Sequence, residues 1–177
     1  LLFHGCIPMN EDGSFATVET LEGPYSGKAL MDYFERKARQ AYFSQDVYAT
    51  DIFYYLWCGP ASPLFGKDKM STFEHCLIED VKTHVENYNA YYSLSKQEEY
   101  ADLILKEFGI DPQTGHIVNG HVPVKVKKGE KPIRAHGKVF VIDGGISKAY
   151  HSKTGIAGYT LIFNSHHLAL AEHHDFI

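Results

Sequence analysis

The sequence predicts an α/β fold, with helices in the first part of the chain and strands in the second. Apolar residues recur at helical spacing after Ser26 and again after Ser95. From Gly115 onward, short runs rich in branched and aromatic residues alternate with glycine-containing turns, which is typical of strands. A chain of 177 residues can bury a genuine core, so we expect one compact unit.

The helices are predicted by their apolar positions and by their first residues. The predicted helices cover residues 27–43, 71–78 and 95–108. The first has an apolar stripe from Leu30 to Tyr42, and the other two begin with the Ser-x-x-Glu pattern of a capping box, at Ser71 and at Ser95. A compact aromatic run at 52–57 ends in a Cys-Gly-Pro turn.

The strands are predicted by short apolar runs between turns. A first strand opens the chain, and the later ones cover residues 117–118, 122–126, 138–142, 159–163 and 168–171. The chain begins inside an apolar pattern and stops after a strand-like segment, which is the appearance of a piece of a larger protein.

Charge and cysteine content narrow the classes of function. The chain has 17 basic and 22 acidic residues and no basic tail, which disfavours binding to nucleic acid or to an anionic membrane. Cys6, Cys58 and Cys76 are an odd number without framework spacing, which favours reduced thiols in a cytoplasmic protein. No signal peptide and no membrane-spanning run are recognisable in the sequence.

Two segments, far apart in the sequence, each place a histidine beside a glycine directly after an apolar run. They are Leu1-Leu2-Phe3-His4-Gly5-Cys6-Ile7-Pro8 and His116-Ile117-Val118-Asn119-Gly120-His121-Val122-Pro123. A strand that ends in this way holds an imidazole at the rim of a sheet, and the glycine leaves room beside an ion. We therefore predict that His4 and His121 are metal ligands. The alternative is a pair of ordinary surface or core histidines.

These segments resemble motifs of a known superfamily. Phe3-His4-Gly5-Cys6-Ile7-Pro8 is similar to the His-Gly-Gly-Leu-Ser-Pro motif of the calcineurin-like metallophosphoesterases, and Asn119-Gly120-His121 resembles their later Gly-His element. Within that superfamily, essentially the whole chain resembles the class 3 bacterial fructose-1,6-bisphosphatases. The stretches that carry the resemblance are Tyr25-Ser26-Gly27-Lys28-Ala29-Leu30, Leu56-Trp57-Cys58-Gly59-Pro60, Phe65-Gly66-Lys67-Asp68-Lys69-Met70, and residues 119–130, 141–145, 147–150 and 155–160.

The resemblance implies a four-layered metallophosphoesterase fold, in which a β-sandwich flanked by helices holds two divalent metal ions, usually manganese. It implies a bacterial, cytoplasmic hydrolase of gluconeogenesis that removes the 1-phosphate of fructose 1,6-bisphosphate. His4 and His121 would then bind the same one of the two ions.

The resemblance also implies that part of the enzyme is missing from this sequence. The Asp-x-His, Gly-Asp-x-x-Asp-Arg and Gly-Asn-His-Glu motifs of the superfamily precede the histidine that matches His4, and none of them occurs here. Residues 1–177 are therefore expected to be the C-terminal portion of one catalytic domain, without catalytic residues of their own. We expect the isolated chain to bind metal weakly and to be inactive, because a dinuclear site needs a bridging carboxylate.

Several lysines are candidates for binding phosphate. Lys125 and Lys127 follow His121, and strand alternation would put both on one face, where they could neutralise the second phosphate of a sugar bisphosphate. Lys67, in a glycine-containing loop, is a further candidate. The alternative is that the lysines belong to a solvated hairpin tip.

Other candidate residues have simpler interpretations. His167 and His173 could share a strand face at even spacing, but solvated imidazoles are the favoured interpretation. Asp143 could orient a ligand histidine, although an Asp-Gly-Gly sequence more commonly makes a tight turn.

Two other functions stay open. A calcineurin-like protein phosphatase would have an acidic or hydrophobic peptide groove in place of a basic pocket. A noncatalytic binding module would hold His4 and His121 too far apart to share an ion. The partners expected for the enzyme are a sugar bisphosphate and the rest of its own chain, and a homo-oligomer is left open.

Overall fold

A computed structural model describes residues 1–145 and 158–174, and it has the mixed α/β composition that the sequence predicts. Its contacts divide the chain into two compact units instead of the one expected. We call Gly5–Leu94 the helical unit, and Leu1–His4 together with Ser95–Ile177 the sheet unit. The stretches 147–150 and 155–157, which contribute to the resemblance, lie outside the described residues.

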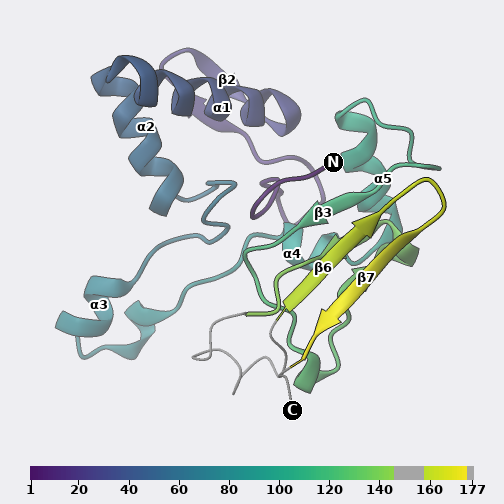
Figure 1. The fold of residues 1–177 in the computed structure, drawn as a ribbon. Coiled ribbons are helices and arrows are strands. Elements are labelled where there is room, and N and C mark those ends of the chain that lie inside the picture. Colours follow the sequence, from purple (N-terminus) through teal and green to yellow (C-terminus); the bar gives the residue numbers. More distant parts are fainter. Residues whose placement is uncertain (146–157, 175–177) are drawn as a thin grey trace. The chain divides into compact units, whose positions relative to one another are not determined.

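The helical unit is built around two packed helices. Its first elements are β1 (Val18–Thr20), β2 (Gly23–Tyr25), α1 (Gly27–Ser44) and α2 (Val47–Cys58) (Figure 1). The two strands form an antiparallel hairpin. The first part of the predicted stripe of α1 is its buried face, because Leu30, Tyr33 and Phe34 pack with Leu56 of α2 in one apolar core. Its last residue, Tyr42, is instead 80% exposed. The aromatic run 52–57 is therefore the second half of a helix, which begins at the N-cap Asp46.

The rest of the helical unit consists of short helices. They are α3 (Thr72–Leu77), a 3-10 turn η1 (Val81–His84) and α4 (Tyr91–Leu94). The short helix after Ser71 is confirmed, but its capping box does not form. The Ser71 hydroxyl instead donates to Glu86 Oε1 at 2.9 Å, because the chain returns a carboxylate to that point.

The sheet unit holds a small mixed sheet. Its elements are α5 (Glu98–Glu107), β3 (Ile117–Asn119), η2 (Val126–Lys128), β4 (Ile133–Arg134), η3 (Ala135–Gly137) and β5 (Val139–Val141). The strand order is β3-β5-β4, with β5 parallel to β3 and antiparallel to β4. The N-terminal segment adds to the other side of β3, since Leu2 forms a parallel bridge with Val118.

Helix α5 is confirmed: Ala101, Ile104 and Leu105 of its predicted stripe are fully buried, and Phe108, the last residue of that stripe, is half-buried at the C-cap. Its capping box is wrong, because the helix begins at Glu98 with Gln97 as an N-cap that makes no side-chain bond. The Glu98 carboxylate pairs with Lys138 at 3.0 Å, so a tertiary ion pair replaces the local cap.

The predicted strand 122–126 is also wrong. Residues 122–125 are irregular, and the chain then enters the 3-10 turn η2, which ends at Gly129 in the left-handed conformation. Pro123 has no backbone N–H to give to a ladder, and the Lys-Lys-Gly sequence suits a tight turn. Lys125 and Lys127 therefore do not alternate along a strand.

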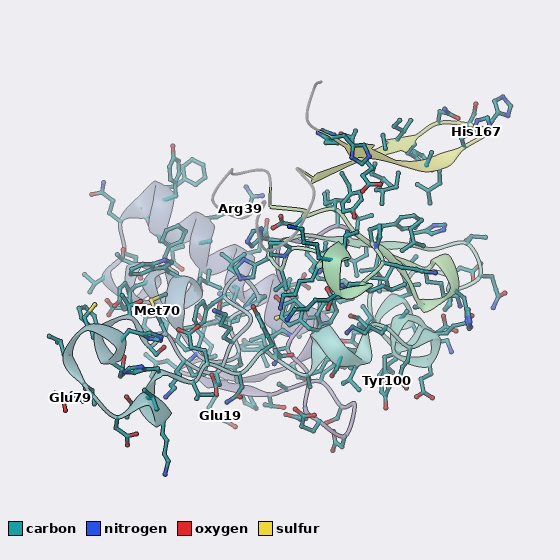
Figure 2. The ribbon with its side chains drawn as sticks, turned by 90° about the horizontal axis from the view of Figure 1, so that it is seen from below. Glu19, Arg39, Met70, Glu79, Tyr100 and His167 are labelled. Atoms are coloured by element: carbon teal, nitrogen blue, oxygen red, sulfur yellow. The ribbon has the colours of Figure 1, made fainter. Side chains whose placement is uncertain are left out.

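The remaining strands form an antiparallel hairpin of β6 (Gly158–Phe163) and β7 (Leu168–His173) (Figure 1). His166 and His167 lie in its turn, where Asn164 Oδ1 accepts both of their backbone N–H groups, and Figure 2 shows His167 at the tip. His173 lies at the far end of β7, opposite Gly158. The interpretation that His167 and His173 share a strand face is therefore wrong, because His167 precedes the strand.

The helices formed by residues 1–145 and 158–174 differ from membrane-spanning helices in length and apolarity. None of these helices is both long enough and apolar enough to cross a bilayer.

Candidate metal centre

Three chain segments of the sheet unit end at the same edge of its sheet. The N-terminal segment, β3 and β5 run parallel, and they lead into His4, Gly120-His121 and Asp143 respectively. Backbone bonds hold the register: Gly120 N donates to His4 O at 2.9 Å, and Ile142 N donates to Asn119 O at 2.9 Å. The carboxyl ends of parallel strands are the usual position of ligand sites in α/β proteins.

The two histidines predicted from the sequence meet at this edge. His4 Nε2 lies 2.9 Å from His121 Nδ1, with the ring planes inclined by 65°. Residues 117 positions apart are brought together because the N-terminal segment pairs in register with β3. His4 is exposed and His121 is half-buried, so the pair is open to solvent on one side.

The backbone of His121 has an uncommon conformation, with φ of 66° in the left-handed region. A non-glycine residue held there costs on the order of 1–3 kcal/mol, and such residues concentrate at functional sites. This conformation follows Gly120 directly and orients the imidazole toward His4. The sequence does not reveal this conformation, because only a small fraction of histidines adopt it even though they are enriched there.

The geometry of the pair fits one bound cation. Two imidazole nitrogens that bind the same ion at about 2.1 Å, at a right angle to one another, lie about 3.0 Å apart. The observed separation of 2.9 Å is close to that value and shorter than the roughly 3.4 Å of a tetrahedral pair, and it is also the length of a hydrogen bond between the two rings. Among residues 1–145 and 158–174, however, no third histidine, cysteine, aspartate or glutamate completes a set of metal ligands.

The glycines beside the two histidines have different roles. A Cβ atom on Gly5 would come closer than 3.0 Å to the Pro63 carbonyl oxygen and would lie 3.0 Å from that of Leu64. A Cβ atom on Gly120 would meet only ordinary contacts at 3.8 Å, from Asp143 and the backbone of His4. Close backbone packing therefore requires glycine at position 5, a reason that the sequence did not reveal.

Asp143 makes a tight turn after β5. Its Oδ1 accepts the backbone N–H of Gly145 at 2.8 Å, which is the local bond expected of an Asp-Gly-Gly sequence. The turn interpretation is confirmed for this carboxylate.

The lysines predicted to bind phosphate differ in their surroundings. Lys125 is half-buried, and its backbone N–H donates to Glu130 Oε2 at 3.0 Å. Lys127 is exposed in η2. Lys67, in the helical unit, pairs with Glu86 at 2.5 Å. The Lys67 ammonium is therefore already neutralised by a carboxylate.

The ion pair with Lys67 also affects the ionisation of the Glu86 carboxyl group. The Lys67 ammonium, together with the N–H and hydroxyl groups of Ser71, lowers the pKa of Glu86 to about 2 from an ordinary value of 4.5.

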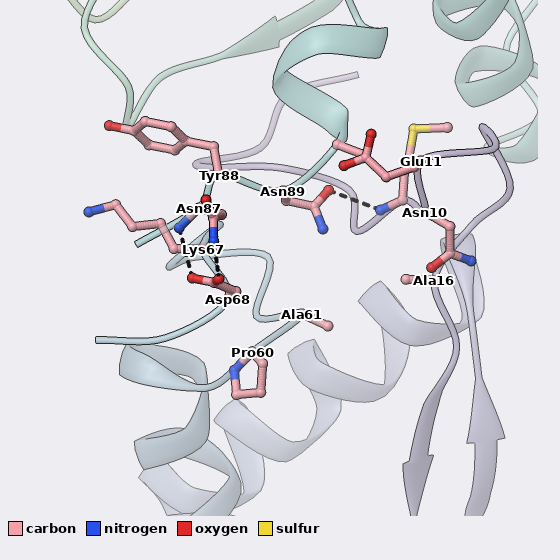
Figure 3. Close-up of a pocket in the computed structure, with 12 residues that line it drawn as sticks. Asn10, Glu11, Ala16, Pro60, Ala61, Lys67, Asp68, Asn87, Tyr88 and Asn89 are labelled. Atoms are coloured by element: carbon pink, nitrogen blue, oxygen red, sulfur yellow. Dashed lines mark hydrogen bonds between the residues drawn. The ribbon is translucent and has the colours of Figure 1, made fainter. Parts of the chain in front are cut away.

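Lys67 and its neighbours line a cavity of about 370 Å³ in the helical unit (Figure 3). Asp68 and Asn87 face each other there, and Asn89 accepts the backbone N–H of Met9 at 3.0 Å. Sequence reasoning missed this cavity, whose one signal is the Asn-Tyr-Asn sequence at 87–89.

The chain was then compared with known proteins. A protein-family model described as Firmicute fructose-1,6-bisphosphatase matches residues 1–177. The chain is 58% identical to a class 3 fructose-1,6-bisphosphatase of Finegoldia magna, and 54% identical to proteins of that name from Clostridium tetani and Clostridium acetobutylicum. Each match covers 99% of this chain but only 27–28% of the relative. No solved structure matches the chain.

Proposed function

The chain belongs to the Firmicute fructose-1,6-bisphosphatase family, and from this premise we propose that it is the C-terminal part of an enzyme that hydrolyses fructose 1,6-bisphosphate to fructose 6-phosphate and phosphate. The single observation that carries the proposal beyond the family match is the 2.9 Å separation between His4 Nε2 and His121 Nδ1 at the sheet edge. The same distance fits a hydrogen bond between the two rings, so metal binding has to be tested directly.

The two histidines are proposed to bind one divalent metal ion. Neutral imidazole suits borderline ions such as manganese and zinc, and manganese is the proposed ion. A bound divalent ion supplies an activated water and a clamp for phosphate oxygens. His4 and His121 would hold the ion in place, because the pairing of the N-terminal segment with β3 and the left-handed backbone of His121 fix the positions of both ring nitrogens.

The remaining ligands are proposed to come from the part of the polypeptide that precedes this chain. Two imidazoles are too few for a catalytic metal site, which takes three or more protein ligands. The chain spans little more than a quarter of the length of its relatives, so ample chain exists to supply the others. The four-layered sandwich is proposed for the completed domain, and a cytoplasmic location is proposed for the enzyme.

Lys125 and Lys127 are proposed to bind the phosphate that is not hydrolysed. Both follow His121 within the sheet unit, and the described residues give Lys125 no carboxylate partner for its ammonium group. Lys67 is kept as a weaker candidate, because a phosphate would have to displace Glu86 from it.

The proposal is tested in the full-length enzyme that contains this chain. We expect His4→Ala and His121→Ala each to lower kcat for fructose 1,6-bisphosphate at least about 100-fold and to reduce the manganese retained after gel filtration. If both side chains bind the same ion, the double variant loses little more than either single variant, because effects within one site are not additive.

His167→Ala is the matched control, because this histidine lies in the β6–β7 turn. It should keep the manganese content and the activity of the unmodified enzyme. Full activity and full manganese content in His4→Ala would refute the proposed metal site. Losses that multiply in the double variant would assign the histidines to separate roles.

A further inference from the structure

The helical unit exposes many large apolar side chains. Monomeric soluble proteins rarely expose a contiguous apolar patch larger than a few hundred Å². Here the end of α1, α2, α3 and η1 present large apolar side chains to solvent. These are Tyr42, Phe43, Val47, Phe53, Tyr54, Trp57, Phe73, Leu77, Ile78, Val81 and Val85.

Helix α2 leaves most of its apolar side chains at least partly exposed. Of its 12 residues only Ala49 and Leu56 are buried, although the helix is strongly apolar. Phe53 and Tyr54 are exposed, and Trp57, 62% exposed, packs edge-on against Tyr54 with ring centroids 5.7 Å apart. A helix that is hydrophobic all round is characteristic of one with partners on more than one side.

Helix α3 and η1 form a short excursion, residues 72–85, that we call the arm. The six-residue helix buries none of its side chains, and Phe73 and Leu77 are 77% and 78% exposed. A helix this short is not stable in water by its own hydrogen bonds and needs packing to persist. Ties at its base hold the arm to the unit: Lys69 Nζ donates to Thr83 O at 2.8 Å, and Ser71 contacts Glu86. Figure 2 labels Glu79 in the turn between α3 and η1.

We propose that the exposed faces of α2 and the arm form an intramolecular docking surface, covered in the full-length enzyme by the preceding part of the same polypeptide. The inference rests on the proposed function, in which this chain is one part of a longer enzyme. More than two thirds of each relative lies outside the region that matches this chain, so a large part of the polypeptide is available to cover these faces. The part of the enzyme that precedes residue 1 is covalently tethered, so its effective concentration at these faces far exceeds that of a separate protein.

The surface also has the composition of a buried interface core. It is rich in aromatic residues, which concentrate in the desolvated centres of interfaces. The free thiol of Cys76 lies in the arm and that of Cys58 at the end of α2, whereas the Cys6 thiol is buried. Chemical access to Cys76 therefore reports whether the arm is covered.

The test uses the full-length enzyme with the photo-crosslinker p-benzoylphenylalanine in place of Phe73. After irradiation we expect an intramolecular cross-link, at the mass of a single chain, from the arm to a peptide that precedes residue 1. A cross-link to a peptide within residues 1–177, a cross-link that doubles the mass, or the absence of any cross-link would overturn the proposal. The same crosslinker in place of Leu21, which is 83% exposed in the β1–β2 turn, is the matched control and should stay uncoupled.

A second measurement does not depend on an introduced side chain. In the unmodified enzyme, Cys76 should react with N-ethylmaleimide at least about tenfold more slowly than in urea, because a covered thiol reacts only after local opening. Reaction of Cys76 at the rate of the denatured chain would overturn the proposal. Phosphatase activity and manganese content of the same preparation test the proposed function separately, since an active enzyme with an accessible arm would refute only the docking surface.

Discussion

The glycines at positions 5 and 120 look equivalent in the sequence, yet the structure predicts opposite responses to the same substitution. Each stands beside a proposed metal ligand and follows or ends an apolar strand. In Gly5→Ala the new methyl group would meet the backbone carbonyl oxygens of Pro63 and Leu64, which cannot rotate away as a flexible side chain could. In Gly120→Ala it would meet only atoms at ordinary contact distance.

The magnitude follows from the contacts around Gly5. Relieving the clash means moving the 62–64 backbone or residue 5, and overpacking of this kind costs about 1–3 kcal/mol. The movement also disturbs the bond that the buried Cys6 N–H donates to Pro63 O at 2.9 Å, which adds about 1 kcal/mol. We therefore expect Gly5→Ala to destabilise the protein by about 3 kcal/mol, and Gly120→Ala by less than about 0.5 kcal/mol.

The assay is thermal unfolding of the two full-length variants, followed by differential scanning calorimetry. For a cooperative unit of about 150–250 residues, a loss of about 3 kcal/mol lowers Tm by about 6–12 °C. Gly120→Ala should stay within about 2 °C of the parent. Manganese content measured on the same samples shows whether the displaced backbone also moves His4. Equal losses of Tm in the two variants, or a larger loss in Gly120→Ala, would refute the packing argument.

Three further predictions follow from the site and its surroundings. Residues 1–177 alone should bind manganese weakly and release no phosphate from fructose 1,6-bisphosphate; a calorimetric titration and a phosphate assay check this, and turnover at the rate of the complete enzyme would contradict it. In the full-length enzyme, Lys125→Gln with Lys127→Gln should raise KM for the bisphosphate more than for a sugar monophosphate, and equal effects would exclude a role for these lysines in binding the second phosphate. The ionised Glu86 carboxylate stabilises the folded state above its unfolded pKa of 4.5, and this contribution is lost as pH falls toward about 2. The Tm difference between the parent and Glu86→Gln should therefore shrink over that pH range, and a constant difference would rule out the proposed linkage.

Local pattern was sufficient for helices α1 and α5, for strands β3, β5, β6 and β7, and for identifying the two histidines. The stripe from Leu30 to Phe34 specifies the buried face of α1, because helical periodicity is a property of the sequence itself. The apolar run before His121 forms β3, whereas the run before His4 forms only a single bridge, from Leu2 to Val118, in place of the predicted first strand. The two predicted capping boxes do not form, because residues distant in the sequence bind their side chains. Ser71 donates to Glu86 instead of capping α3, and Glu98 pairs with Lys138.

The sequence by itself determined the composition of the fold, the family and the identity of the candidate metal ligands. Only the tertiary structure decided that His4 and His121 approach to 2.9 Å, that Gly5 is required by a backbone contact, and that Lys67 is already paired. It also decided that the aromatic residues of α2 face solvent in this part of the chain. The physical reason is how far apart in the sequence the interacting residues lie. Helical and strand periodicity depends on neighbours a few residues away, whereas the pairing of parallel segments joins residues more than a hundred positions apart.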